Sequence, residues 1–251
     1  MPRGDPVENR RQFPMAVCAM IEGKGICKSF GNRVILSDAS FLIPEGQIVG
    51  LSGKSGIGKT TLARIMCGII PPDSGNIYRN GAPLWVNNTY KRTEGLTIQM
   101  VSQHPFSSLD PRQKLISGVR ELIHYHHFAS DGKETDTLIE NIAREVGLIR
   151  EILQQFPHQI SGGEAQRTVI ARCLLFKPEL LILDEATSML DVSTQANIIG
   201  LVKRMQNAQG RSILLISHAD DLVKATCDRI YEIDHTKFRL LPSDLEEQKA
   251  I

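Results

Sequence analysis

Gly53, Gly58, Lys59 and Thr60 have the types and spacing that most clearly indicate chemistry, because they fit the pattern G-x-x-x-x-G-K-[ST]. Glycines adopt positive φ and let successive backbone N–H groups close around phosphate oxygens. The lysine then supplies a cation for the outer phosphates, and the threonine hydroxyl can ligate magnesium. The pattern therefore predicts a site for a nucleoside triphosphate.

The residues on either side of this loop supply the elements that it needs. Ile48–Leu51 is an apolar run typical of a buried strand, and a helix is expected from Lys59 onward. The positive end of that helix dipole would face the phosphates. An ordinary glycine turn is the alternative, but at average composition this pattern arises by chance in roughly one chain of this length in a hundred. The predicted nucleotide contacts are Gly53, Lys54, Ser55, Gly56, Gly58, Lys59, Thr60 and Thr61.

A second apolar run, Leu180–Leu183, ends in the carboxylates Asp184 and Glu185. Ligands bind at the carboxyl ends of strands in open α/β sheets. Beside a phosphate-binding loop, Asp184 is expected to hold magnesium, through water, and Glu185 to act as the general base or to orient the attacking water. The alternative is that the two acids only cap the next element.

The segment Ile160–Arg167, which reads ISGGEAQR, resembles the signature motif of ATP-binding cassette (ABC) ATPases and lies one helix before the acidic strand. The resemblance extends over residues 21–241 and implies ATP and Mg²⁺ as cofactors. It also implies an α/β fold: a P-loop NTPase core with a mainly parallel sheet, an N-terminal antiparallel β subdomain and an inserted α-helical subdomain. The composition of residues 1–19, rich in proline and polar residues, predicts a flexible extension, and docking on a partner is the alternative. The ATPase domain is expected at 20–241 and a tail at 242–251. Within the domain, 20–103 and 161–241 form the core and 104–160 the helical subdomain.

The resemblance assigns roles to single residues. Gln103 is similar to the Q-loop glutamine, which contacts magnesium or the attacking water, and His218 is similar to the switch histidine near the γ-phosphate. Phe30 resembles the aromatic that stacks on adenine, although a core or turn aromatic is the alternative. The segment 188–191 is similar to the D-loop. The implied catalytic set is Glu185, His218 and Gln103, the metal set is Thr60, Gln103 and Asp184, and the further nucleotide contacts are Phe30, Ser161, Gly162, Gly163, Glu164 and Asp191.

Three positions depart from the usual family pattern. Glu164 stands where glutamine is commonest, Ile160 where leucine is, and Ala186 where proline often follows the catalytic glutamate. None of the three removes a catalytic group, so the resemblance still implies an active ATPase.

The family resemblance also implies partners. Ser161, Gly162 and Gly163 open a helix and so form a second anion site, which in the family closes on ATP held by a second ATPase subunit, head to tail. The segments 103–111, 156–159 and 191–196 resemble the peptide and nickel importer group. Membership implies two transmembrane permease subunits, an extracytoplasmic substrate-binding protein acting indirectly, and a position on the cytoplasmic face of the inner membrane. No iron–sulfur cluster is expected, since the long cysteine-rich C-terminal extension of some members is missing.

Two other functions remain open at the level of sequence. A soluble ABC-type ATPase in cofactor assembly or phosphonate metabolism would have the same site, so the motifs do not separate it from an importer subunit. A DNA-repair or translation ATPase is disfavoured, because only one phosphate loop is present and no coiled-coil insertion interrupts the cassette. A formal net charge of +1 over 251 residues gives no basic excess, and we expect no nucleic-acid partner.

The remaining features set weaker limits. Five scattered cysteines form no metal or disulfide pattern and suggest free thiols in a reducing compartment. No run approaches the roughly 20 apolar residues that span a bilayer. His124 and His127 are spaced to share a helix face, which raises the alternative of a metal site, but a hydrated or partner-facing helix is favoured.

The hydrophobic periodicity predicts the elements that must carry these residues. We expect strands within 20–44, a hairpin at 76–83, a strand at 96–101, helices through 113–151, a helix at 161–176, a helix at 192–206, a strand at 212–217, a helix at 220–227, and a closing hairpin at 229–233 and 237–241. Buried strands that alternate with helices predict a largely parallel sheet.

Overall fold

The computed structural model describes residues 19–91, 98–186, 190–234 and 237–241 of the chain. Most of the predicted N-terminal extension, the predicted tail, and Ser188 and Met189 of the predicted D-loop lie outside the described residues. The first described element begins at Ala19, the last residue of the predicted extension.

An antiparallel sheet is built mainly from the N-terminal third of the chain. Its order is β2 (Arg33–Pro44), β1 (Ala19–Phe30), β4 (Ser74–Arg79) and β5 (Ala82–Pro83). The β1–β2 hairpin closes at the predicted turn, where Phe30 pairs with Arg33. A second, unpredicted hairpin joins β6 (Trp85–Val86) to β7 (Thr89–Tyr90).

A six-stranded, mainly parallel sheet forms the centre of the molecule. Its order is β12 (Lys237–Leu241), β11 (Arg229–Asp234), β3 (Ile48–Ser52), β10 (Ser212–Ile216), β9 (Leu180–Asp184) and β8 (Ile98–Val101). Only β11 and β12 pair antiparallel. Every residue of β3, β9 and β10 is buried, which explains their uninterrupted apolar runs, since both faces of the sheet are covered.

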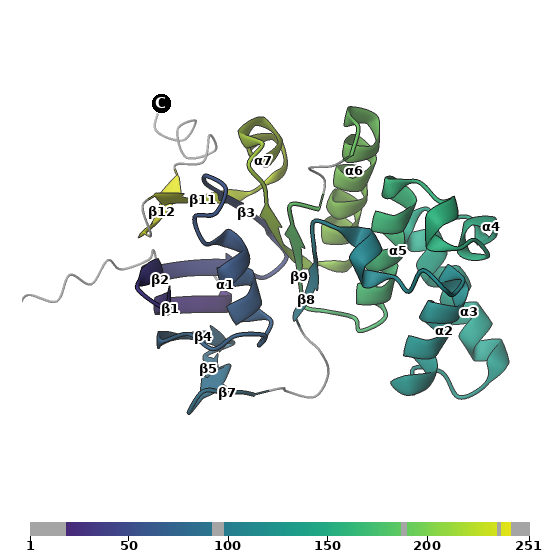
Figure 1. The fold of residues 1–251 in the computed structure, drawn as a ribbon, viewed down its shortest axis with the longest axis horizontal. Coiled ribbons are helices and arrows are strands. Elements are labelled where there is room, and N and C mark those ends of the chain that lie inside the picture. The colour runs from purple at the N-terminus through teal and green to yellow at the C-terminus, as the bar shows by residue number, and fades with distance from the viewer. Residues whose placement is uncertain (1–18, 92–97, 187–189, 235–236, 242–251) are drawn as a thin grey trace, which may run out of the picture.

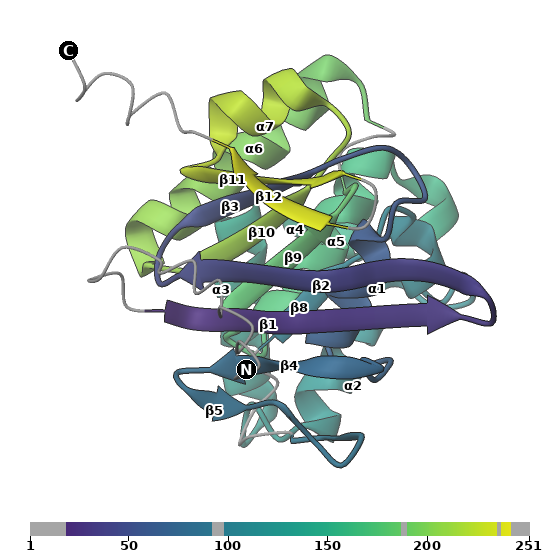
Figure 2. The same ribbon diagram turned by 90° about the vertical axis from the view of Figure 1, so that its left-hand side faces the viewer.

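Helices and the second sheet provide that cover. Helix α1 (Lys59–Met66) lies between the two sheets, and one apolar cluster joins it to both (Figure 1). The opposite face of the parallel sheet packs against α5 (Gly162–Leu174) and α6 (Val192–Gln209) in a second cluster. Helix α7 (Asp220–Thr226) packs on β3. Figure 2 shows the antiparallel sheet lying in front of the parallel one.

A block of helices is inserted between β8 and α5. It consists of η1 (Pro105–Ser108), α2 (Leu115–Tyr125), α3 (Gly132–Val146), α4 (Arg150–Leu153) and η2 (Pro157–Gln159). The side chain of Asp131 caps α3 by accepting a hydrogen bond from the Glu134 N–H. Arg211, just before β10, forms an ion pair of 3.0 Å with Glu145 of α3, which ties the block to the core. The predicted α/β class, with its antiparallel and helical additions, is confirmed.

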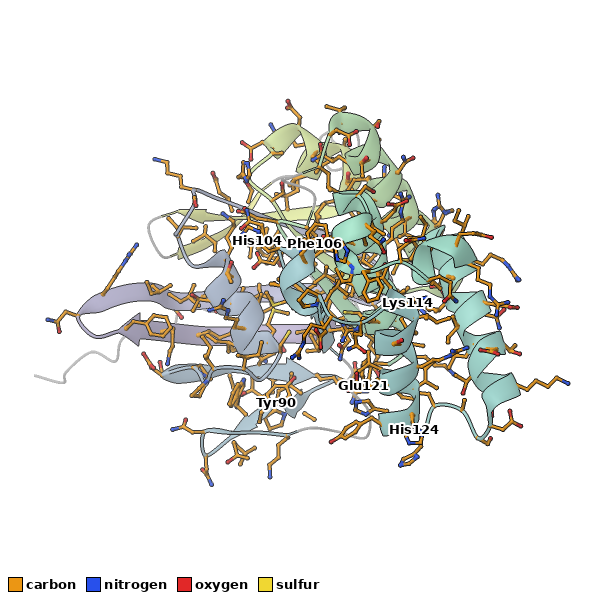
Figure 3. All side chains as sticks on the ribbon, turned by 45° about the vertical axis from the view of Figure 1, so that its right-hand side comes forward. Tyr90, His104, Phe106, Lys114, Glu121 and His124 are labelled. Carbon is orange, nitrogen blue, oxygen red and sulfur yellow. The ribbon has the colours of Figure 1, made fainter. Side chains whose placement is uncertain are left out.

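The prediction that His124 and His127 share a helix face is wrong. Helix α2 ends at Tyr125, and His127 has φ 53°, a left-handed conformation outside the helix. His124 lies at the opposite end of α2 from Lys114 and points outward (Figure 3). Among the described residues, no three His, Cys, Asp or Glu side chains lie close enough together to hold a metal ion.

Candidate nucleotide-binding site

Three neighbouring parallel strands end side by side and bring most of the predicted site residues together. In register, Leu51 of β3 lies beside Ile216 of β10, and Ile216 lies beside Asp184 of β9. Two backbone hydrogen bonds continue the ladder beyond these strands, from the Glu185 N–H to the Ile216 carbonyl (2.9 Å) and from the Ser217 N–H to the Leu51 carbonyl (3.3 Å). The phosphate loop, the two carboxylates and His218 therefore follow directly from fixed strand ends.

The glycine-rich loop between β3 and α1 requires glycine for close packing. Gly58 has φ 120°, and a Cβ atom there would lie 2.8 Å from Cγ2 of Ile35 in β2. A side chain at this position would push the β1–β2 hairpin away from the loop. The loop then leads directly into α1 at Lys59, so the positive end of the helix faces the loop interior.

Lys59 is buried beneath this loop with only 4% of its side chain exposed. Its Nζ donates hydrogen bonds to the carbonyl oxygens of Gly53 (2.6 Å) and Lys54 (3.1 Å). Burial lowers the pKa of Lys59, while the nearby carboxylates of Glu185 and Asp184 oppose that shift. The side chain is a confined cation at the base of a loop that suits phosphate.

Asp184 is a buried carboxylate with an unused oxygen. Burial raises its pKa, and a hydrogen bond from the Thr60 hydroxyl opposes the shift. Its Oδ1 atom is inaccessible to solvent and has no hydrogen-bond partner in the described part of the chain. A buried oxygen of this kind, next to a hydroxyl, fits a hard divalent cation that takes one or two carboxylates and completes its shell with phosphate and water. The donor set therefore fits Mg²⁺.

Glu185 and His218 form the rest of the cluster. Glu185 has φ 49°, and its Oε1 lies 3.6 Å from Nδ1 of His218 and 3.9 Å from Nζ of Lys59. Glu185 is mostly shielded from solvent, whereas 57% of the His218 side chain is exposed. The carboxylate thus faces a cation on one side and an imidazole at the solvent edge on the other.

One contact at this site was missed by the sequence reasoning. The buried hydroxyl of Ser52, at the end of β3, donates a 2.7 Å hydrogen bond to Oδ1 of Asp220, two residues after His218. It joins the start of the phosphate loop to the loop that carries the histidine. A hydroxyl at the end of an otherwise apolar strand was the signal that could have indicated it.

Gln103 and Phe30 lie on segments that border the cluster. Gln103 comes two residues after β8, which pairs with β9, so it follows the next strand end in the sheet. Phe30 is 53% exposed at the tip of the β1–β2 hairpin. The guanidinium of Arg33, at the same tip, donates to the carbonyl of Gly56 at 3.5 Å, which places the hairpin beside the phosphate loop.

The predicted signature motif begins helix α5. Ser161 is the N-cap, and its Oγ accepts a hydrogen bond from the Glu164 N–H at 3.3 Å. In return, the Glu164 carboxylate accepts from both the N–H and the hydroxyl of Ser161, each at 2.8 Å. Glu164 therefore completes a capping box that needs only an acceptor oxygen, which a glutamine at this position would also supply.

The signature helix packs against the start of α6. A Cβ atom on Gly163 would lie 2.4 Å from Cγ2 of Thr194, so only glycine fits there. Asp191, the N-cap of α6, accepts hydrogen bonds from the Thr194 N–H and from the Ser193 and Thr194 hydroxyls, which hold its pKa well below the usual range. Both of its carboxylate oxygens are engaged within its own helix, and its contact with nucleotide stays a prediction.

Known proteins are similar to this chain over most of its length. The family model described as "ABC transporter" matches residues 36–188. The chain is 36% identical over 217 residues to the oligopeptide transport ATP-binding protein AmiF of Streptococcus pneumoniae serotype 4, which covers 84% of this chain and 70% of AmiF. It is also 36% identical over 205 residues to the nickel import ATP-binding protein NikE of Shigella dysenteriae serotype 1, which covers 81% of this chain and 76% of NikE.

Solved structures show the same fold. CbiO1 of Clostridium perfringens, described as part of the ABC transporter complex cbiONQ, aligns with a TM-score of 0.78 and 24% identity, over 92% of this chain and 91% of CbiO1. The ATP-binding cassette MJ0796, solved as a dimer bound to ADP and phosphate, aligns with a TM-score of 0.75 and 26% identity, over 89% of this chain and 99% of MJ0796. The chain therefore belongs to the ABC transporter family, and it is an ATP-binding ATPase of that family.

Proposed function

We propose that this chain is the ATP-hydrolysing subunit of an importer for peptides, nickel or metal–chelate complexes. One observation carries the proposal: the ends of β3, β10 and β9 gather a buried lysine, an unpartnered buried carboxylate oxygen and a second carboxylate at one point. The names of relatives that span most of the chain, oligopeptide and nickel ATP-binding proteins, support the cargo class.

In this proposal, each residue of the cluster has one task. The phosphate loop and Lys59 bind the β- and γ-phosphates, and Thr60, Asp184 and Gln103 hold Mg²⁺, which neutralises charge on the phosphates. Glu185 accepts the proton of the attacking water, and His218 lies at the solvent side, toward the γ-phosphate. Phe30 stacks on the base. Lys59 must exchange its hydrogen bonds to loop carbonyls for bonds to phosphate when ATP arrives.

We further propose that two ATPase subunits close head to tail on ATP, with Ser161, Gly162 and Gly163 of one facing the phosphates held by the other, and Asp191 at the junction. The second subunit is a different chain or a copy of this one. ATP drives closure because it binds the closed arrangement more tightly than the open one. The capped start of α5 supports this role, since it offers N–H groups at a helix N-terminus.

Residues 104–160 are proposed to form the subdomain that meets two permease subunits, at the cytoplasmic face of the membrane. A cavity of about 310 Å³ lies where η1, α2 and α5 meet, and its lining includes Asp110, Lys114 and Arg172. Phe106 is 45% exposed on η1, and Figure 3 shows it next to His104. This mixed polar site suits a short helix from a permease. No helix in the described part of the chain is long and apolar enough to cross a membrane.

Mass spectrometry of proteins that co-purify with this chain from gently solubilised membranes tests the proposal. The expected partners are two polytopic membrane proteins and an ATPase subunit, with a substrate-binding protein whose ligand identifies the cargo. A matched sample of the chain with Lys114→Glu and Arg172→Glu should lose the membrane proteins and keep the ATPase partner. Recovery of soluble partners alone would instead establish an assembly ATPase with the same site.

A further inference from the structure

A lysine covers one face of the Phe30 ring. Nζ of Lys28 lies 5.5 Å from the ring centroid, within the range of a cation–π contact. The two residues are two positions apart on β1, so their side chains lie on the same face of the sheet. Phe30 is nevertheless 53% exposed, so much of the ring remains free for another contact.

Asp73 fixes this lysine in place. Oδ1 of Asp73 accepts a 2.7 Å hydrogen bond from Nζ of Lys28, and Oδ2 accepts one of 2.7 Å from the N–H of Ser29. The Asp73 N–H in turn donates to the carbonyl of Cys27 at 2.9 Å. Three hydrogen bonds thus tie the segment between α1 and β4 to the strand that carries Phe30. Only 12% of the Lys28 side chain is exposed.

This assembly lies beside the phosphate loop. Arg33 pairs with Phe30 across the hairpin end and donates to the carbonyl of Gly56. Ile35, two residues further along β2, packs against Gly58 of the same loop. The hairpin tip that carries Phe30 therefore lies beside the phosphate loop.

We propose that Lys28 and Asp73 are positioning residues that hold the Phe30 ring for stacking of the nucleotide base, with the base on the face opposite Lys28. This inference rests on the proposed role of Phe30. The ammonium attracts the ring's π electrons toward its own face, and the opposite face repels the π face of a base less strongly. The ion pair with Asp73 keeps the ammonium over the ring in the absence of nucleotide.

The arrangement has a consequence for ligand selectivity. Every nucleobase has a π face, so stacking distinguishes nucleotides from base-free phosphates far better than it distinguishes one base from another. The two rings of a purine overlap Phe30 more than a pyrimidine does. The chain should consequently bind MgATP and MgGTP with similar affinity and bind MgCTP more weakly.

The test measures dissociation constants by titration calorimetry on the full chain, for MgATP and for magnesium tripolyphosphate, which has no base. Lys28→Met should raise the dissociation constant for MgATP by up to about fivefold, because the strength of the cation–π contact limits how far Lys28 can fix the ring for stacking. The same change should leave the dissociation constant for magnesium tripolyphosphate unchanged. Lys28→Arg should retain wild-type affinity, because a guanidinium also packs on aromatic faces.

Lys24→Met is the matched control. Lys24 lies on the same strand with Nζ 5.2 Å from the ring of Tyr78, so the change removes the same charge and the same type of contact. It should leave MgATP affinity unchanged. Asp73→Asn should weaken MgATP binding less than Lys28→Met does, since an amide oxygen still accepts from Lys28 but without the charge.

The outcomes distinguish the positioning role of Lys28 from base stacking by Phe30. If Lys28→Met lost affinity for MgATP and for tripolyphosphate equally, the lysine would act by general attraction for phosphate, and the positioning role would be overturned. Wild-type MgATP affinity in Lys28→Met, together with a loss in Phe30→Ala, would overturn it as well and leave the role of Phe30 intact. Wild-type affinity in Phe30→Ala would refute base stacking itself. If Lys28→Met does not fold, Asp73→Asn gives the same comparison, with a smaller loss of affinity for MgATP and none for tripolyphosphate.

Discussion

Nζ of Lys59 and Oε1 of Glu185 lie 3.9 Å apart, and the two side chains are only 4% and 17% exposed. The lysine belongs to the helix after β3 and the glutamate to the end of β9, so this pair spans the strand β10 that lies between them. Opposite charges held this close and shielded from solvent interact more strongly than they would in water. Atoms 3.9 Å apart leave no room for a phosphate between them, so the proposed function requires this pair to separate when ATP binds.

Glu185→Gln should bind ATP with near wild-type affinity and hydrolyse it at least about 10²-fold more slowly, because an amide cannot accept the proton from water. Steady-state phosphate release by the assembled complex, alongside nucleotide binding, measures both effects. Wild-type turnover in this variant would eliminate Glu185 as the general base. Glu232→Gln is the control, because Glu232 is a partly buried glutamate on β11 of the same sheet. This variant should hydrolyse ATP at the wild-type rate.

Asp184→Asn should unfold at a higher temperature than the wild type at pH 7 when no nucleotide is present. Burial raises the pKa of Asp184 above the ordinary 3.8, so the folded chain holds a proton at this group more readily than the unfolded chain does. The contribution of Asp184 to the free energy of unfolding therefore falls as pH rises above 3.8 through the folded-state pKa. Asparagine removes that dependence, and each kcal/mol regained corresponds to about 2–4 °C.

The same variant should gain less from MgATP. A ligand that binds only the folded chain stabilises it in proportion to the logarithm of its concentration over its dissociation constant. Melting curves with and without MgATP, at pH 5 and pH 7, would show both effects. A wild-type shift with MgATP in Asp184→Asn would exclude this carboxylate from the metal site.

Asp220→Ala and Ser52→Ala each remove one partner of a hydrogen bond, and each should lower the maximal rate of hydrolysis several-fold and change ATP affinity little. Their 2.7 Å hydrogen bond joins the loop of His218 to Ser52 at the end of β3, and its loss frees the histidine while leaving the residues that contact phosphate in place. A double-mutant cycle on the maximal rate measures the coupling. Additive effects of the two changes would show that the contact does not position His218. Asp221→Ala, at the next residue along, is the matched control.

Gly163→Ala should destabilise the fold by about 1–3 kcal/mol, as overpacking does in a tight interior. The added methyl would lie 2.4 Å from Cγ2 of Thr194. Thr194→Ser removes that methyl and keeps the hydroxyl that donates to Asp191. The double variant should therefore recover most of the stability in urea unfolding. Equal stability of Gly163→Ala with and without Thr194→Ser would place the strain elsewhere.

The central sheet could be predicted from sequence because its strands are buried on both faces. Burial on both sides leaves runs such as Leu180–Leu183 without polar interruption, and such runs are visible in a sequence. The position of the candidate site follows from the same fact, since the motif residues directly follow these strands. The roles given to individual residues stay predictions that the experiments above address.

The features that were missed depend on contacts between distant parts of the chain. The β6–β7 hairpin is held by Trp85, whose Nε1–H donates to the carbonyl of Ile65, and by Tyr90, whose hydroxyl donates to that of Met66. Ser52 and Asp220 are 168 positions apart, and Lys28 and Asp73 are 45 apart. Local periodicity carries no information about such pairs. Nor did it show that the left-handed conformation of His127 follows the end of α2.

The register of β3, β10 and β9 fixes the distances between the residues that follow these strands. Adjacent strands lie about 4.8 Å apart, and side chains alternate between the two faces along each strand. Inserting or deleting one residue within β10 would turn every following side chain to the opposite face and would carry His218 away from Glu185. Because every residue of β10 is buried, the strand can accept other apolar residues of similar size but hardly any change of length. Length variation is instead compatible with the turn at Gly210, where the backbone is exposed and left-handed before the strand begins.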